Sequence, residues 1–98
     1  MKIIAIDRME DCFNGDFMVK YTLDVQWTKG AIQALEKLGR LQYYDSFPKP
    51  MFQLNCSDGA IVKGVQGTCE CRVIYSRDGL DDARKRFEKR FEETIYSF

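Results

Sequence analysis

The sequence predicts a single α+β domain over residues 1–98, in the order β-β-α-β-β-β-α, with a mostly antiparallel five-stranded sheet and two helices packed on one face. Apolar residues alternate with polar ones over residues 17–27, which is the period of a half-buried strand. Near the end of the chain they recur every three or four positions, which is the period of a helix face. A length of 98 residues, 45% of them hydrophobic, is sufficient for one core.

The first two strands are predicted to form a hairpin over residues 3–13 and 17–27. Between them, Asn14-Gly15 is the preferred pair for a two-residue type I′ turn, because both positions need a positive φ. Counted from that turn, Ile6 faces Leu23. The outward side of this hairpin is expected to be hydrated or to serve as an interface, and it consists of Asp7, Met18, Lys20, Thr22, Asp24 and Gln26.

A helix over about residues 29–38 is expected next. Thr28 is a suitable N-cap and Gly39 a suitable residue beyond the last turn, although the helix has room to continue through Leu41. Pro48 and Pro50 then exclude helix and central strand, so residues 43–50 are predicted to be a loop. The apolar stripe of the helix consists of Ala31, Ile32, Leu35 and Leu38.

Three short strands are expected over residues 52–75, separated by turns at Gly59 and Gly67. A second helix follows, and Asp78 is a natural N-cap for it. Its apolar residues lie at three- and four-residue steps, as expected for a helix that covers a sheet. They are Leu80, Ala83, Phe87, Phe91, Ile95 and Phe98.

Composition excludes several classes of function. Fifteen basic residues balance fifteen acidic ones, so the chain lacks the broad positive field that supports nonspecific nucleic-acid binding. No apolar run approaches the ~18 residues of a membrane span, and the first one is too short for a signal-peptide core. We therefore expect a cytoplasmic protein. Histidine is absent, which disfavours an enzyme, and we assign no catalytic residue and no cofactor.

Four cysteines equal the number of thiols that a zinc or iron–sulfur site needs. Their spacing contains no Cys-x-x-Cys pair, and a meander over residues 52–75 would separate Cys56 from Cys69 by roughly 20 Å. We interpret the cysteines as small core residues. The alternatives are a reactive thiol or a metal site at Cys69 and Cys71. The full set is Cys12, Cys56, Cys69 and Cys71.

The last helix also carries a run of cations, which we term the basic patch. Such a surface can hold phosphate, nucleic acid or an acidic protein. Acidic residues four positions away offer the alternative of a solvated helix face held by weak ion pairs, and we favour this interpretation. The basic patch consists of Arg84, Lys85, Arg86, Lys89 and Arg90.

Three aromatic residues gather in the predicted loop over residues 43–50. Tyr43, Tyr44 and Phe47, with Met51 next to them, are candidates for an interaction surface. The alternative is that they fold back and close one end of the core. Both interpretations stay open at this point.

The order of elements resembles that of two groups of domains. From residue 29 onward, α-β-β-β-α resembles a double-stranded-RNA-binding domain, which implies a lysine-rich patch at the start of the last helix. Asp78-Gly79-Leu80-Asp81-Asp82 occupies that place and would repel phosphate, so we set this family aside. The whole order resembles longin and profilin-like domains, which implies an interaction or small-ligand module.

The leading hypothesis is a non-catalytic module that binds a protein partner or assembles with itself, a homodimer being one outcome of strand-edge pairing. One alternative is a thiol- or metal-binding accessory protein that uses Cys69 and Cys71. Another is a small-ligand-binding protein or enzyme with a pocket beside the loop over residues 43–50, with Tyr44, Asp45 or Lys49 at its mouth.

Overall fold

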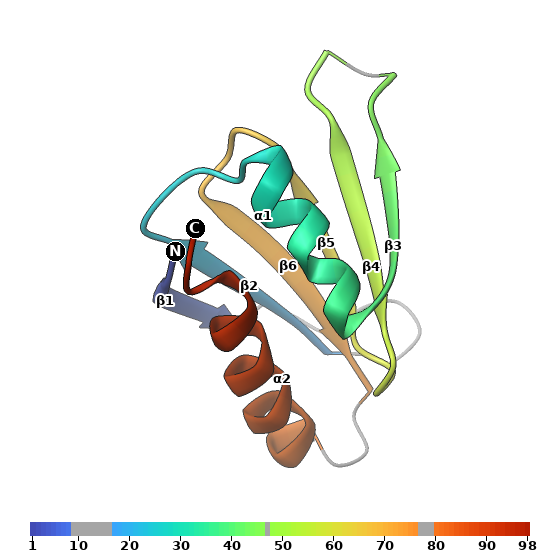
Figure 1. Cartoon of the computed structure of the whole chain (residues 1–98). Helices are drawn as coiled ribbons and strands as arrows, with labels where there is room; N and C mark the ends of the chain where they lie inside the picture. The colour runs from blue at the N-terminus through green and yellow to red at the C-terminus, as the bar shows by residue number, and fades with distance from the viewer. Residues whose placement is uncertain (9–16, 47, 77–79) are drawn as a thin grey trace.

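Among the residues that the computed structural model describes, which are 1–8, 17–46, 48–76 and 80–98, six strands form one sheet and two helices lie on one of its faces (Figure 1). The strand order is β1-β2-β6-β5-β4-β3, and every neighbouring pair is antiparallel. The predicted α+β class and antiparallel sheet are therefore confirmed. The elements are β1 (Ile3–Arg8), β2 (Phe17–Leu23), α1 (Lys29–Ala34), the 3₁₀ turn η1 (Leu35–Leu38), β3 (Gly39–Tyr44), β4 (Met51–Cys56), β5 (Ile61–Val65), β6 (Glu70–Tyr75) and α2 (Leu80–Ile95).

The strand β3 is the one that the sequence analysis missed, so the predicted count of five strands is wrong by one. It begins directly after η1, which rules out a helix that continues through Leu41. A Cβ atom on Gly39 would lie 2.1 Å from the backbone oxygen of Asn55, so this glycine permits the close approach of β3 to β4. The pairing extends to Tyr44 opposite Met51. Residues 43–50 are consequently not one loop.

The extra strand also changes the topology. Four strands, not three, lie between the two helices in the described chain. The order that suggested both family resemblances is therefore not the order observed.

The first hairpin has a different register from the one predicted. Ile6 lies opposite Tyr21 rather than Leu23, and the pairing is irregular between Ile3 and Ala5. The strand β2 ends at Leu23, four residues earlier than expected. The Asn14-Gly15 turn and Cys12 lie outside the described residues.

Both helices pack on the sheet through the predicted residues. The side chain of Thr28 accepts a hydrogen bond from the backbone N–H of Ala31 at 3.2 Å, which confirms the N-cap of α1. In α2, Phe87, Phe91 and Ile95 are buried, as their spacing predicts. The helix ends before Phe98, and Asp78 lies outside the described residues.

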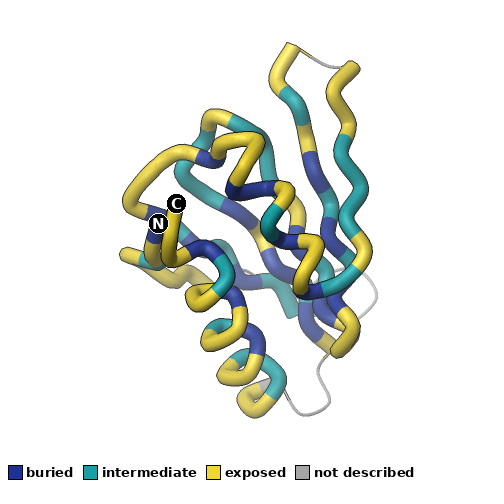
Figure 2. The backbone as a smooth tube through the Cα atoms, in the orientation of Figure 1, coloured by how far each residue is buried: buried dark blue, intermediate teal, exposed yellow. Residues whose placement is uncertain are grey.

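The core lies between the sheet and the helices. Buried segments follow alternate positions of the central strands and the sheet-facing sides of α1 and α2 (Figure 2). Its largest fully buried side chains are aromatic, and Trp27 packs edge-on against Phe52 with ring centroids 5.0 Å apart. The two described helices are both too short or too polar to cross a bilayer. Because both cover the same side, no helix of the described chain lies on the opposite sheet face.

Candidate functional site on the helix-free face

The outward side chains of the five strands from β2 to β3 form one continuous surface, which we term the open face. Successive side chains of a strand point to opposite sides of a sheet. Since Val19, Tyr21 and Leu23 of β2 enter the core, the residues between them must point away from it. The open face consists of Met18, Lys20 and Thr22 of β2, Glu70, Arg72 and Ile74 of β6, Ile61, Lys63 and Val65 of β5, Met51, Gln53 and Asn55 of β4, and Arg40, Gln42 and Tyr44 of β3.

Strand register places three cations side by side on this surface. Lys20 on β2 lies directly opposite Arg72 on β6, and Arg72 lies directly opposite Lys63 on β5. We term these residues the cationic row. Adjacent strands are ~4.8 Å apart, so the row extends roughly 10 Å across the sheet.

Apolar side chains lie on both sides of the cationic row. On one side Ile74 is opposite both Met18 and Ile61. On the other side Met51 is opposite both Val65 and Tyr44. Along β5 the open face therefore alternates apolar, cationic and apolar rows, whereas on β6 and β2 the third row holds Glu70 and Thr22.

The open face is hollowed into a groove of about 540 Å³. Tyr44 and Met51 stand at the groove with 44% of each residue exposed. Gly64 lies beneath it, and a Cβ atom there would meet the Phe52 ring at 2.5 Å, so glycine lets that core ring pack against the strand. The groove is lined by Met18, Tyr44, Met51, Phe52, Gln53, Lys63, Gly64, Val65, Thr68, Glu70, Cys71 and Arg72.

The groove carries excess positive charge. Its one described carboxylate, Glu70, forms an ion pair with Lys20, whose Nζ lies 3.3 Å from the Glu70 Oε2. Lys63 and Arg72 are exposed, and neither has a carboxylate within ion-pair distance among the described residues. Like charges directly opposite each other destabilise a strand pair. The arrangement therefore favours an anionic group between Lys63 and Arg72.

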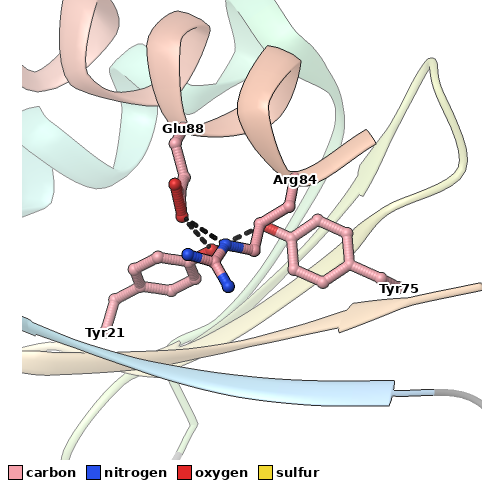
Figure 3. Close-up of polar contacts among 4 residues, drawn as sticks. All are labelled: Tyr21, Tyr75, Arg84 and Glu88. Atoms are coloured by element: carbon pink, nitrogen blue, oxygen red, sulfur yellow. Dashed lines mark hydrogen bonds and ion pairs between the residues drawn. The ribbon is translucent and has the colours of Figure 1, made fainter. Parts of the chain in front are cut away.

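The helix-covered face holds a polar network of a different kind (Figure 3). The Tyr21 hydroxyl donates to the Glu88 Oε2 at 2.9 Å, and the Tyr75 hydroxyl lies 2.7 Å from that of Tyr21. Since Tyr21 has one proton to donate, Tyr75 must donate to Tyr21. The Arg84 Nε completes the network by donating to the same Glu88 oxygen at 3.1 Å.

This network is closed. Burial raises the pKa of both Tyr21 and Tyr75, so neither phenol ionises near neutral pH. Every buried side-chain polar atom in the described part of the chain has a hydrogen-bond partner. The network holds α2 on the sheet through hydrogen bonds between Tyr21, Tyr75, Glu88 and Arg84.

The described thiols do not gather into one site. Cys56 and Cys71 are core residues, and Cys69 is half-buried just before β6 begins. Burial raises the pKa of the Cys56 thiol to about 12, and burial raises the pKa of Cys71 as well. No group of three metal-ligating side chains occurs within the described ranges. The thiols with described pKa shifts are thus protonated and poorly nucleophilic at neutral pH.

The structure separates the predicted interaction candidates. Tyr44 and Met51 come together at the groove, whereas Tyr43 points toward the core and its hydroxyl donates to the Gln66 Oε1 at 2.6 Å. Phe47 lies outside the described residues. Tyr43 therefore packs against the core, whereas Tyr44 and Met51 remain exposed, and an interaction role for these two stays a prediction.

The basic patch lies elsewhere, and of the predicted pocket mouth only Tyr44 lines the groove. Lys85, Arg86, Lys89 and Arg90 are exposed on α2, on the helix-covered side of the sheet, and Arg84 belongs to the closed network. Neither Asp45 nor Lys49 lines the groove. The basic patch and the groove therefore form separate surfaces.

The cationic row was not predicted from the sequence. Lys20 was expected on an outward face, and Lys63 and Arg72 occupy polar positions of alternating strands, so the orientation of each was available from the sequence. The sequence does not show that β2, β6 and β5 are neighbours in the sheet, because strand order depends on tertiary packing.

Comparison with protein-family models, curated proteins and solved structures gives no match in any of the three searches.

Proposed function

We propose that this domain is a non-catalytic module that binds a protein partner in the groove of the open face. The observation that carries the proposal is the hollow itself: an apolar-lined groove of about 540 Å³ on the sheet face opposite both helices. Partly exposed Met18, Met51 and Tyr44 lie around it. Apolar surface of this kind, bordered by polar side chains, is typical of protein-binding sites.

The chemistry of the described side chains supports binding over catalysis. The buried phenols of Tyr21 and Tyr75 have raised pKa values and saturated hydrogen bonds, and the thiols of Cys56 and Cys71 have raised pKa values in the core. A general base or a nucleophile needs a pKa near the working pH and access to substrate. The groove offers instead a cation pair and apolar contacts, which are groups that recognise a ligand.

A random-peptide library displayed on phage provides the test, because it assumes no particular partner. Selected peptides should bind in the groove, and backbone amide shifts of the ¹⁵N-labelled domain should change at β4, β5 and β6. Met51→Ser should weaken binding by about fivefold or more, the effect of losing one important contact. The matched control is Tyr96→Ser, since Tyr96 is 81% exposed and lies beyond the end of α2.

Three results would contradict the proposal. One is that the library yields no specific binder to the folded domain. The other is that bound peptides shift the amides of α1 and α2 while those of the open face stay unchanged. Equal weakening by Met51→Ser and Tyr96→Ser would also place the binding site away from the groove.

Self-assembly through the sheet edge is a second candidate function, supported by the exposed side chains of β1. This edge strand exposes Ile4 and Ile6 to 59% and 42%. Unpaired edge strands with apolar side chains favour pairing between copies of a chain. Size-exclusion chromatography with light scattering tests it: a dimer that Ile6→Lys converts to a monomer supports edge pairing, and a wild-type monomer at high concentration excludes it.

A further inference from the structure

We infer that the groove recognises an acidic peptide segment with the pattern apolar-x-acidic-x-apolar, where x is any residue; this inference rests on the proposed function. The acidic side chain would lie between Lys63 and Arg72. The two apolar side chains would lie on the apolar rows on either side of the cationic row. The observations behind it are charge, register and spacing.

Two cations of the groove have no ion-pair partner among the described residues. Glu70 and Lys20 neutralise each other at 3.3 Å, which leaves the opposed pair Lys63 and Arg72 as the source of positive charge in the groove. A carboxylate between them would relieve their mutual repulsion and accept hydrogen bonds from both. The guanidinium of Arg72 presents a planar fork that suits a carboxylate.

The distance between rows on the open face matches the distance between alternate side chains of an extended peptide. Neighbouring rows on the open face are separated by two residues along each strand, which is ~6.8 Å. An extended peptide also places every second side chain on one side, at the same ~6.8 Å interval. A peptide that lies along β5 and β6 therefore brings residues i, i+2 and i+4 onto successive rows. The first row would receive an apolar side chain at Ile61 and Ile74, which lie beside the groove without lining it, and the second row an acidic one. The third row would receive an apolar side chain at Val65 and Met51, on the side of β5 away from Glu70.

The lining of the groove favours a peptide over single-stranded nucleic acid. Nucleic-acid platforms stack successive bases on several exposed aromatic rings. The groove presents Tyr44 as an exposed ring, while the Phe52 ring is buried in the core. Met18, Met51 and Val65 supply aliphatic and thioether contacts, which suit apolar side chains.

Charge reversal provides a direct test with the same random-peptide library. The wild-type domain should enrich Asp or Glu at one position with apolar residues two positions before and after it. The double variant Lys63→Glu and Arg72→Glu should enrich Lys or Arg at that position instead. The matched control, Lys85→Glu with Arg86→Glu on α2, reverses two charges outside the groove and should select the same acidic peptides as wild type.

Affinity for one selected peptide makes the test quantitative. Replacing its acidic residue by the amide should weaken binding to wild type by about tenfold, the range expected for a charge-assisted contact. The same replacement should have little effect on the neutral double variant Lys63→Gln and Arg72→Gln. This neutral variant also serves if the charge-reversed domain does not fold, because it should lose the acidic preference without gaining a basic one.

The outcomes separate this inference from the proposed function. Peptides that bind the groove without an acidic preference would overturn the acidic pattern and leave the binding module intact. Absence of any groove binder would overturn both. Tight binding of an oligouridylate that depends on Lys63 and Arg72, with no binding of acidic peptides, would show that the cations serve nucleic acid and would overturn the peptide assignment.

Discussion

The two faces of the sheet are formed by the same strands but differ in their packing and in the pairing of their polar groups. On the helix-covered face, the aromatic rings of Tyr21, Phe87 and Phe91 are packed together, and each buried side-chain nitrogen or oxygen atom of the described residues has a hydrogen-bond partner. On the open face, Lys63 and Arg72 lie opposite each other, and neither has a carboxylate within ion-pair distance among the described residues. Since side chains alternate along a strand, neighbouring residues divide between the core and the proposed recognition surface. The difference indicates that the open face was not shaped by folding alone.

The largest effect should come from removing a core ring. Phe91 is fully buried and stacks on Phe87 with ring centroids 5.1 Å apart. Phe91→Ala should lower the free energy of unfolding by about 3–5 kcal/mol, because it removes apolar burial and leaves a cavity. Met51→Ala on the open face should cost less than about 1 kcal/mol. Urea denaturation followed by tryptophan fluorescence measures both, and a larger loss for Met51→Ala would contradict the division between the faces.

The helix-covered face could be predicted from the sequence in most of its detail. The alternation in β2 and the helical spacing of Phe87, Phe91 and Ile95 depend on local periodicity, which tertiary structure rarely overrides when it is strong. The Thr28 cap follows equally from local chemistry. Local sequence patterns are therefore sufficient to predict these features.

The open face could be predicted only in part. The strand β3 was not predicted, because its alternation of apolar and polar residues is weak. Leu41 and Tyr43 are the only inward apolar residues of this short segment, which lies close to two prolines. The hairpin register was wrong because the predicted turn at Asn14-Gly15 fixed the count, whereas the observed pairs of β1 and β2 are shifted from it. The cationic row depends on which strands are neighbours, and no local pattern contains that information.

A smaller effect should come from the buried polar network. Tyr21 makes two hydrogen bonds, to Glu88 and to Tyr75, so Tyr21→Phe breaks both and leaves the Tyr75 hydroxyl without its partner. We expect a loss of about 1–3 kcal/mol. Tyr75→Phe removes one bond and leaves Tyr21 bound to Glu88, so it should cost about 0.5–1.5 kcal/mol. Urea denaturation should rank the two variants in this order, and the reverse order would mean that the hydrogen-bond assignment is wrong.

Alkaline pH should lower the free energy of unfolding, because the buried thiols of the helix-covered face must stay protonated in the folded domain. Burial raises the pKa of Cys56 and Cys71 above the value of ~8.5 for a free cysteine, so the unfolded chain loses these protons first as pH rises. Stability from the protonated thiols is fully present below about pH 8 and falls above it, by about 1 kcal/mol per thiol between pH 9 and pH 10. Cys71→Ala should reduce that fall by about 1 kcal/mol. Denaturation at both pH values under reducing conditions measures it, and equal pH dependence in variant and wild type would show that Cys71 ionises normally in the fold.

The smallest change in the free energy of unfolding should be a gain rather than a loss. It provides the sharpest test of the contrast between the two faces. Arg72 lies directly opposite both Lys20 and Lys63, so Arg72→Gln removes two like-charge contacts and should raise the free energy of unfolding by about 0.5 kcal/mol at low salt. The gain should shrink in 1 M salt, where the screening length falls to ~3 Å. The same variant should bind acidic peptides more weakly than wild type. A residue whose replacement improves folding while impairing binding is retained at a cost to stability, as expected at a recognition site. If Arg72→Gln instead destabilises the domain at both salt concentrations, the arginine stabilises the sheet. That result would contradict a binding role for the cationic row.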